Sequence, residues 1–354
     1  MNNSMVKACA ALSLLSLNFH TAIPAVAQSK KAESTVAEIA LYQGQDRFQR
    51  LIEGAKKEGE LTYYQSRSDI GPALDAFTKK YGIKVNNWRA SGETVLQRVL
   101  TEARGGRSEV DIVETGEPQL EALHREKLLQ RVYSPYHGEL MPAAIPGHKE
   151  WAGTTFDIFV AAYNTDKVKK EELPKTYQDL LDPKWKGRLG IEAEDQPWFA
   201  TLVQVLGEEK GGKLFKDIVA TNGISTRKGH TLLANLVGSG EVPLGLTIYN
   251  YSPEQMKQKG APIDSFVIPP AIGKFNSIGL LKKAPHPHAA VLFYDFMLYE
   301  GQQILANRYY IATNNKIGNP LKKLPLTFID AELSIDMNDK WSKAFEEVFV
   351  KRTK

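Results

Sequence analysis

Two arginines follow predicted β-strands at positions where a side chain can hold an anion. Arg67, with Ser66 beside it, comes after the strand-like segment 61–65, and Arg227 ends the segment 224–227. A guanidinium group binds a carboxylate or phosphonate through two parallel hydrogen bonds. We therefore expect Ser66, Arg67 and Arg227 to contact an anionic ligand. The alternative for each arginine is a solvated surface position.

Small and hydroxyl residues begin the helices that follow the neighbouring strands. Ser91, Gly92 and Thr94 open one helix, and Thr115 and Gly116 precede another. Free N–H groups and the helix dipole favour anions at such helix starts. We expect these residues to bind the ligand as well. Ser91 is also a good N-cap, and the two roles can coexist.

Aromatic and histidine residues near two further helix starts leave alternatives open. Asp195 precedes a helix and is predicted to be its N-cap, whereas Trp198 inside that helix either lines the ligand pocket or packs in the core. His286 and His288 form an H-x-H pair at the start of another helix. They lack an adjacent third ligand, so we expect surface turn residues there rather than a metal site.

These candidate residues require a scaffold of alternating strands and helices. Strand-like and helix-like segments alternate over 61–125 and again over 176–249, and a single long helix is predicted over 287–306. This rhythm predicts an α/β fold with mixed, mostly parallel sheets that carry helices on both faces. Such sheets bind ligands beyond the carboxyl ends of their strands, which is where the candidate residues lie.

The N-terminal segment predicts export. Lys7 is the only charge in the first 19 residues, an apolar run covers 8–17, and Ala25-Val26-Ala27 follows. This pattern is typical of a secretory signal peptide, here residues 1–27, and implies a periplasmic protein. The alternative is a lipoprotein anchored through Cys9. No later segment is apolar enough to cross a membrane, so we expect no membrane insertion of the mature chain.

Composition excludes several classes of function. Cys9 is the only cysteine of the 354 residues, so the mature chain has no disulfide, thiolate metal site or cysteine nucleophile. The net charge is +4 and the charges are interspersed, which disfavours nucleic-acid binding. No G-x-S-x-G, H-E-x-x-H or glycine-rich phosphate loop is present, so we do not expect an enzyme.

Several segments, in order, resemble one protein family. They are LLDPKWKGR at 180–188, VAAYN at 160–164, the strand-like segment 275–281, KAPHPHAA at 283–290 and the segment 296–302. Over about 61–305 the chain resembles the family-one extracellular solute-binding proteins of ABC importers, in particular their iron(III)-type branch. The resemblance implies two Rossmann-like lobes of the periplasmic-binding-protein type, joined by crossing strands near 159–163 and 270–275, with the ligand between the lobes.

The resemblance also implies the division of the chain. Lobe 1 comprises 59–157 with 275–312, and lobe 2 comprises 158–274. A leader and helix occupy 28–58. The helical segment 313–354 belongs to either lobe.

Tyr249 and Tyr251 fall where iron-binding relatives carry two adjacent tyrosines. Phenolate oxygens are hard ligands that suit Fe(III). Aligning the strand ends, however, places Asn250 and Tyr251 on the paired positions, so one phenol is replaced. The positions of the other two usual ligands hold Arg67 and Gly116. An arginine beside Fe(III) is costly unless an anion intervenes. In the alternative, Tyr249 is a core aromatic and Tyr251 alone faces the ligand.

We therefore expect the receptor of an ABC importer for a small anionic organic solute, such as a carboxylate or phosphonate. In this reading it uses no cofactor, works as a monomer and delivers the solute to an inner-membrane permease. The first alternative is a ferric-iron receptor that binds Fe³⁺ through Tyr249 and Tyr251. Alternatives of other classes are a periplasmic sensor subunit and an exported enzyme.

Overall fold

The computed structural model describes residues 35–351, in which strands and helices alternate. The strands are β1 (Glu60–Gln65), β2 (Lys84–Arg89), β3 (Ile112–Gly116), β4 (Leu129–Gln130), β5 (Trp151–Asn164), β6 (Leu189–Glu192), β7 (Ser225–Arg227), β8 (Leu244–Tyr249), β9 (Ile263–Phe266), β10 (Ala271–Leu281), β11 (Ile311–Ala312) and β12 (Leu326–Phe328). The α-helices are α1 (Val36–Leu41), α2 (Arg47–Glu58), α3 (Gly71–Tyr81), α4 (Gly92–Arg104), α5 (Glu117–Arg125), α6 (Gln196–Leu206), α7 (Glu208–Asn222), α8 (His230–Ser239), α9 (Tyr251–Gln258), α10 (Pro287–Leu298), α11 (Glu300–Ala306), α12 (Ala331–Asp336) and α13 (Asn338–Phe345).

The strands form one mixed sheet in the order β2-β1-β3-β10-β5-β8-β6-β7, with β4, β9, β11 and β12 paired along β5 and β10. β1 pairs in parallel with β2 and β3, and β6 pairs in parallel with β7 and β8. β5 and β10 run antiparallel to each other and to their main neighbours. The α/β fold with mixed sheets that the sequence predicts is confirmed.

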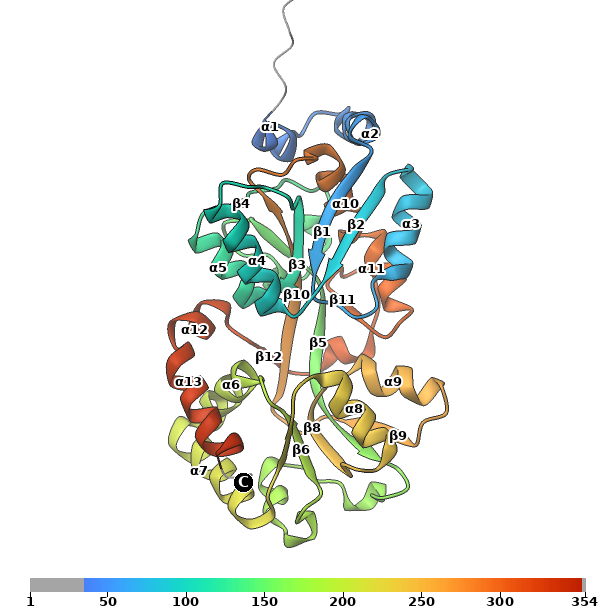
Figure 1. The fold of residues 1–354 in the computed structure, drawn as a ribbon. Coiled ribbons are helices and arrows are strands. Elements are labelled where there is room, and N and C mark those ends of the chain that lie inside the picture. Colours follow the sequence, from blue (N-terminus) through green and yellow to red (C-terminus); the bar gives the residue numbers. More distant parts are fainter. Residues whose placement is uncertain (1–34, 352–354) are drawn as a thin grey trace, which may run out of the picture. The chain divides into compact units, whose positions relative to one another are not determined.

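β5 and β10 connect the two parallel parts of the sheet (Figure 1). Up to Ile158, β5 pairs with β10; from Phe159 onward it pairs with β8 and β9. These are the strands that the sequence predicts to cross between lobes. The lobe boundaries themselves stay a proposal.

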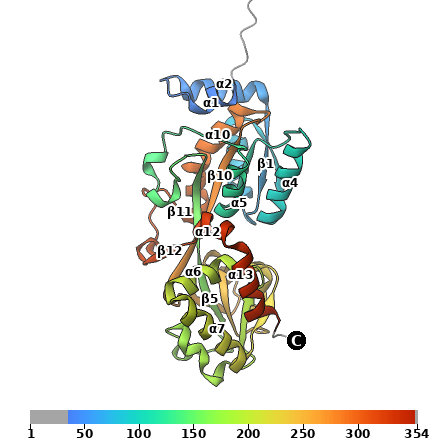
Figure 2. The ribbon, with the colours of Figure 1, turned by 90° about the vertical axis from the view of Figure 1, so that its left-hand side faces the viewer.

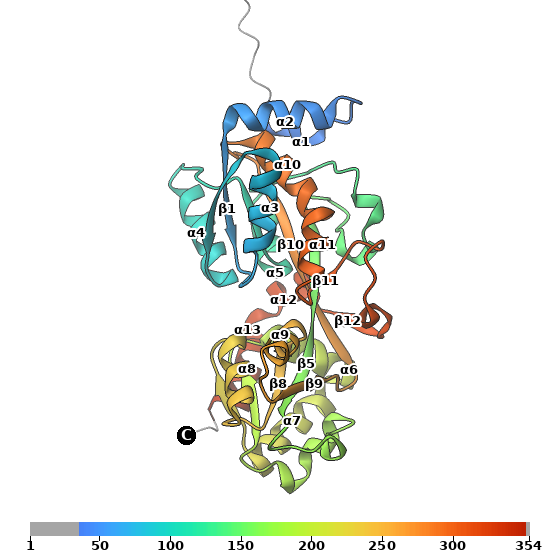
Figure 3. The ribbon, with the colours of Figure 1, turned by 90° about the vertical axis from the view of Figure 1, so that its right-hand side faces the viewer.

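Both faces of each parallel part are covered by helices. In the first part, Tyr63 packs with α3 and α10 on one face, whereas its neighbour Tyr64 packs with α4 and α5 on the other. Figure 3 shows α3, α10 and α11 together on the face of Tyr63. In the second part, Leu246 packs toward α6 and α7, and Ile248 packs toward α8. The adjacent residues Tyr63 and Tyr64 face opposite sides because side chains alternate along a strand. Leu246 and Ile248, two residues apart, do so because the register between β5 and β8 shifts there.

The segment that follows β12 packs against both parts of the sheet. α12 contacts α5, and α13 contacts α6 (Figure 2). Trp341 and Phe345 of α13 are buried against Phe199 of α6. The aromatic contacts make this segment part of the core beside α6.

Two element predictions need correction. The predicted single helix over 287–306 is two helices, because Tyr299 leaves the helical conformation (φ −130°, ψ −82°) and its ring stacks on Tyr136 with centroids 5.1 Å apart. The predicted leader 28–58 contains the additional helix α1. A capping box between Thr35 and Glu38 begins that helix.

The predicted signal peptide, residues 1–27, and its alternative anchor Cys9 lie outside the described residues. Within residues 35–351, no helix combines the length and the apolar character that crossing a membrane requires.

Candidate ligand-binding site

Arg67 lies buried at the end of β1, with only 6% of its surface exposed. Its Nη2 donates hydrogen bonds to Glu114 Oε1 at 2.7 Å and to Thr155 Oγ1 at 2.8 Å. Its guanidinium carbon lies 4.6 Å from the centre of the Tyr310 ring. Burial alone would lower the pKa of Arg67, but Glu114, Tyr310 and Asp157 act together against it, and the net effect raises that pKa. The guanidinium is therefore permanently charged.

Two nitrogens of this buried guanidinium remain available. Nε and Nη1 of Arg67 are shielded from solvent and have no hydrogen-bond partner among the described residues. Glu114, by contrast, also accepts from Thr154 Oγ1 at 2.6 Å and from the Tyr63 hydroxyl. Buried donors are normally bonded, so the two nitrogens are suited to an acceptor on a ligand.

The small and hydroxyl residues predicted from the sequence gather beside Arg67. Ser66 Oγ lies 3.3 Å from Thr115 Oγ1. A Cβ at Gly92 would lie 2.7 Å from that Thr115 oxygen, and a Cβ at Gly116 would lie 3.2 Å from Lys274 Cε. Both glycines therefore permit close approach of neighbouring side chains.

Ser91 caps α4, as the sequence predicts. Its Oγ accepts a hydrogen bond from the Thr94 N–H at 3.2 Å and lies 2.8 Å from Thr94 Oγ1. The hydroxyls of Ser91 and Thr94 thus bond each other at the start of this helix. Their role as ligand contacts remains a prediction.

Three tyrosines lie side by side at the ends of β8 and α11. The rings of Tyr249 and Tyr251 are stacked with centroids 6.1 Å apart, and those of Tyr251 and Tyr310 are 4.3 Å apart. Burial, together with nearby negative charge or a neighbouring phenol, raises the pKa of Tyr249 and of Tyr251. The Tyr310 hydroxyl is buried without a hydrogen bond of normal geometry. Each phenol is thus neutral unless a cation binds it.

A lysine and an aspartate face each other across β5 and β10 beside these tyrosines. Lys274 and Asp157 are register partners, and Lys274 Nζ donates to the Tyr249 hydroxyl at 3.0 Å. Asp157 accepts from Asn276 Nδ2 at 2.7 Å through Oδ2, whereas its buried Oδ1 has no partner within the described chain. Burial raises the pKa of Asp157 against the opposing charges of Arg67 and Lys274.

Asn250 has a structural role in holding this arrangement. Its Oδ1 accepts from the Ile158 N–H at 2.8 Å, and its Nδ2 donates to the Tyr309 carbonyl at 3.1 Å. One side chain therefore ties the turn after β8 both to β5 and to the loop that carries Tyr310.

Arg227, predicted as a second anion clamp, does not join this group. Its side chain lies 3.5 Å from exposed Glu241 and donates to the carbonyl of Thr226 at 3.2 Å. No ion pair or hydrogen bond within the described residues connects it to Arg67 or the tyrosines. The second cation beside the tyrosines is Lys274.

Trp198 occupies the core, which is the second of its two predicted roles. It is 1% exposed and packs against Phe159, Tyr177 and Phe215. Asp195 occupies the N-cap position of α6, as predicted, but its side chain is buried and makes no capping hydrogen bond.

The two histidines of the H-x-H pair bond to carboxylates. Nδ1 of His286 lies 3.0 Å from Asp111, and Nδ1 of His288 lies 2.7 Å from Glu58. They are partly buried rather than free turn residues.

The sequence analysis did not identify Lys274, Asp157 or Tyr310. Lys274 and Asp157 are each the only charged residue in an otherwise largely apolar strand. That pattern could have indicated them, because a buried charge normally requires a partner. Tyr310 carries no local signal, since it reaches the site only through the turn that follows α11.

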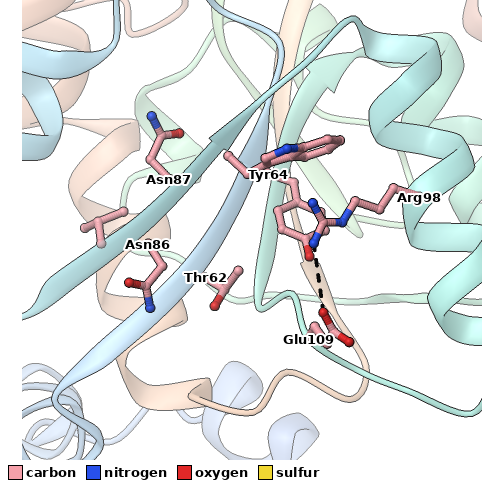
Figure 4. Close-up of a pocket in the computed structure, with 8 residues that line it drawn as sticks. Thr62, Tyr64, Asn86, Asn87, Arg98 and Glu109 are labelled. Atoms are coloured by element: carbon pink, nitrogen blue, oxygen red, sulfur yellow. Dashed lines mark ion pairs between the residues drawn. The ribbon is translucent and has the colours of Figure 1, made fainter.

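A surface pocket lies away from these residues (Figure 4). Its volume is about 540 Å³ and its walls come from β1, β2 and α4, with Arg98 between the rings of Tyr64 and Trp88. It shares no residue with the group around Arg67.

Comparison with known families identifies the class of protein. Residues 119–332, more than half of the chain, match the family described as bacterial extracellular solute-binding protein. The chain therefore belongs to this family, and the resemblance drawn from its sequence is confirmed.

Individual relatives are named for iron. Iron uptake protein A1 of Synechocystis is 29% identical over 299 residues, covering 77% of this chain and 80% of that protein. The Fe(3+)-binding periplasmic protein of Serratia marcescens is 28% identical, covering 73% of this chain and 79% of that protein. The crystal structure of iron-bound HitA from Pseudomonas aeruginosa superposes with a TM-score of 0.70 at 26% identity, over 82% of this chain and 99% of that one.

Proposed function

We propose that this protein is the periplasmic receptor through which an ABC importer captures ferric iron together with a small anion. The observation that carries the proposal is the row of Tyr249, Tyr251 and Tyr310 beside two cationic side chains, buried Arg67 and partly buried Lys274. The relatives named for iron favour the same cargo. Iron, the alternative in the sequence analysis, thus becomes the first candidate.

The phenols and Asp157 supply the oxygen ligands that a hard cation requires. Their high pKa values oppose ionisation in the free protein, but a bound trivalent ion is the largest local charge and reverses that preference. Asp157 Oδ1 has no other partner in the described chain and is suited to the same ion.

Arg67 explains why the cargo includes an anion. A bare ferric ion beside a permanent guanidinium would be repelled. An anion between them, carboxylate or phosphate, would accept from the free Nε or Nη1 of Arg67 while it ligates the metal.

A thermal-shift comparison of ferric citrate with citrate alone tests this proposal. A ligand present at 100 times its Kd adds about 2.7 kcal/mol to the unfolding free energy, a shift on the order of 4 °C for a chain of this size. We expect a shift with ferric citrate, reduced in Tyr251→Phe. Tyr299→Phe is the matched control, because that ring also stacks on a tyrosine but lies outside the site.

A second candidate, a metal-free carboxylate or phosphonate, is favoured by the two unpartnered nitrogens of Arg67. In that case citrate or a phosphonate alone produces the full shift, and Tyr251→Phe changes it little. The two candidates therefore predict opposite results for iron dependence.

A further inference from the structure

A second group of potential metal ligands lies behind Tyr249, outside the set proposed for the cargo. Glu192 ends β6, Asp195 precedes α6 and His230 begins α8, so loops at the carboxyl ends of adjacent strands bring them together. One ligand atom from each lies within 4.8 Å of the other two. The His230 ring lies against that of Tyr249, with centroids 3.9 Å apart.

Hydrogen bonding fixes which nitrogen of His230 faces this group. Nδ1 lies 3.1 Å from the carbonyl oxygen of Thr247, which can only accept, so Nδ1 carries the hydrogen. Nε2 of the neutral ring then directs its lone pair toward Asp195 Oδ1, 3.4 Å away. Two acceptors cannot face each other stably without a proton or a cation between them.

Asp195 provides the second, independent observation. Its residue surface is 5% exposed, and Oδ2 is buried without a hydrogen bond of normal geometry. A buried carboxylate oxygen normally accepts a hydrogen bond or contacts a bound cation or water. The helix that follows does not supply one, because the side chain makes no capping bond to α6.

Glu192 is held in place by backbone donors. Its Oε1 accepts from the Gly229 N–H at 2.7 Å, and its Oε2 accepts from the Glu194 N–H at 2.5 Å. Each carboxylate oxygen keeps a second lone pair for a further partner. Together with the bond from His230 to Thr247, these contacts orient the ligands in the way that outer-shell partners do in metal sites.

We propose that Glu192, Asp195 and His230 bind one divalent transition-metal ion such as Zn²⁺. With metal–ligand bonds of about 2.1 Å, two ligand atoms of a tetrahedral site lie about 3.4 Å apart. The gap between His230 Nε2 and Asp195 Oδ1 is 3.4 Å. One imidazole with two carboxylates suits zinc better than calcium or magnesium, which prefer oxygen ligands throughout.

The charges of the group favour a cation. Glu192 and Asp195, with Glu194 nearby, face two lysines that already have partners: Lys274 bonds the Tyr249 hydroxyl, and Lys228 pairs with Glu194. The site shares no ligand with the proposed ferric site, although Tyr249 of that site lies against the His230 ring. A bound ion would fix the starts of α6 and α8 and the ring on which Tyr249 rests.

Calorimetric titration of the iron-free protein with Zn²⁺ tests the proposal, with Mg²⁺ as the comparison metal. We expect one zinc site, and a loss of at least about tenfold in affinity in both Asp195→Asn and His230→Gln. Cobalt(II), as a spectroscopic probe, should show visible bands of a four-coordinate ion that disappear in His230→Gln. Magnesium should bind far more weakly.

A second histidine group supplies the matched control. Glu121, His124 and His148 also lie close together, but the two imidazoles are stacked with an interplanar angle of 16°, so their in-plane lone pairs do not converge on one ion. His148→Gln should therefore leave the zinc site intact. Thermal unfolding and circular dichroism of each variant verify the fold.

The proposal is overturned if zinc does not bind, or if it binds equally in Asp195→Asn and His230→Gln. In that case a proton, not a metal ion, would lie between His230 Nε2 and Asp195 Oδ1. Failure of the iron proposal gives a different pattern: zinc binding would persist in wild type and in Tyr251→Phe, while ferric citrate would have no effect on either.

Discussion

The ion pair between Arg67 and Glu114 is the most deeply buried charge pair of the proposed site, with side chains 3% and 1% exposed. Removing one partner of such a pair leaves an uncompensated buried charge. The intact ion pair can nevertheless add little to the unfolding free energy when it is compared with two apolar side chains of similar size. A role in ligand binding therefore explains this buried pair better than a contribution to stability does.

Arg67→Ala should lower the unfolding free energy by about 3–5 kcal/mol, because the buried carboxylate of Glu114 loses its ion-pair partner. Adding Glu114→Gln should restore part of the loss. Urea denaturation of the two single variants and the double variant measures this coupling. A loss below about 1 kcal/mol in Arg67→Ala would show that solvent reaches Glu114.

Glu117 provides a pH-dependent contribution. Burial raises its pKa from 4.5 to about 7, opposed by the neighbouring Trp151 and Ser277. The folded protein then binds more protons than the unfolded chain between these values, so stability should fall as the pH rises from about 4.5 to 7. Glu117→Gln should flatten that slope in denaturant melts. If the pH dependence of stability is unchanged in Glu117→Gln, a group other than Glu117 causes it.

At the level of single residues, Arg67 and Thr115 were predicted because each follows a predicted strand, and Tyr249 and Tyr251 were predicted from the family resemblance. The sequence could not predict Tyr310, which reaches the site through tertiary packing. It placed Asp195 at the N-cap of α6 but did not predict the direction of its side chain, because an aspartate there can either cap the helix or turn inward. Only the surrounding loops decide between these two outcomes.

At the level of elements, α10 is capped by a residue from another helix. Glu58, the last residue of α2, accepts hydrogen bonds from the backbone N–H groups of His288 at 3.1 Å and Ala289 at 2.8 Å, and from the His288 ring. The end of α2 is thereby joined to the start of the buried helix α10.

Glu58→Ala should cost about 1–2 kcal/mol, since it frees N–H groups of the first turn of α10. Glu53→Ala is the control, because Glu53 is exposed on the same helix. Within residues 35–351, its side chain accepts a hydrogen bond only from Gln49. Chemical denaturation compares the two. Equal losses would indicate that helix propensity, not the cap, is responsible.

The last α-helix contributes to the core beside α6. Phe345 is 1% exposed and contacts Phe199 and Phe349. Phe345→Ala should lower the unfolding free energy by about 3–5 kcal/mol, whereas Lys343→Ala on the exposed face should have little effect. A small loss in Phe345→Ala, measured by thermal unfolding, would mean that α13 is not part of the cooperative unit.

The strand and helix rhythm was predictable because its periods of 2 and 3.6 residues are local. The break at Tyr299 was not, because the apolar pattern continues through it and the stacking partner Tyr136 is distant in sequence. The helix α1 also escaped prediction, since it is only one and a half turns long and depends on burial of Ile39 and Ala40.

At the level of the whole molecule, two groups of loops meet at the proposed site. Arg67 and Tyr310 come from one parallel part of the sheet and its helices, and Tyr249 and Tyr251 come from the other. The ring contact between Tyr251 and Tyr310 and the hydrogen bond from Asn250 to Tyr309 join them directly. A ligand bound by both groups would stabilise their contact, as expected for a solute-binding protein.

A visible absorption titration of the apo-protein with ferric citrate tests the central claim most directly. Iron bound by tyrosinate oxygens produces a charge-transfer band that citrate solutions of iron lack. We predict a saturable band with one equivalent of iron, lost in Tyr251→Phe and retained in Tyr299→Phe. No band, with a thermal shift caused by citrate alone, would contradict the account and identify the protein as a receptor for metal-free anions.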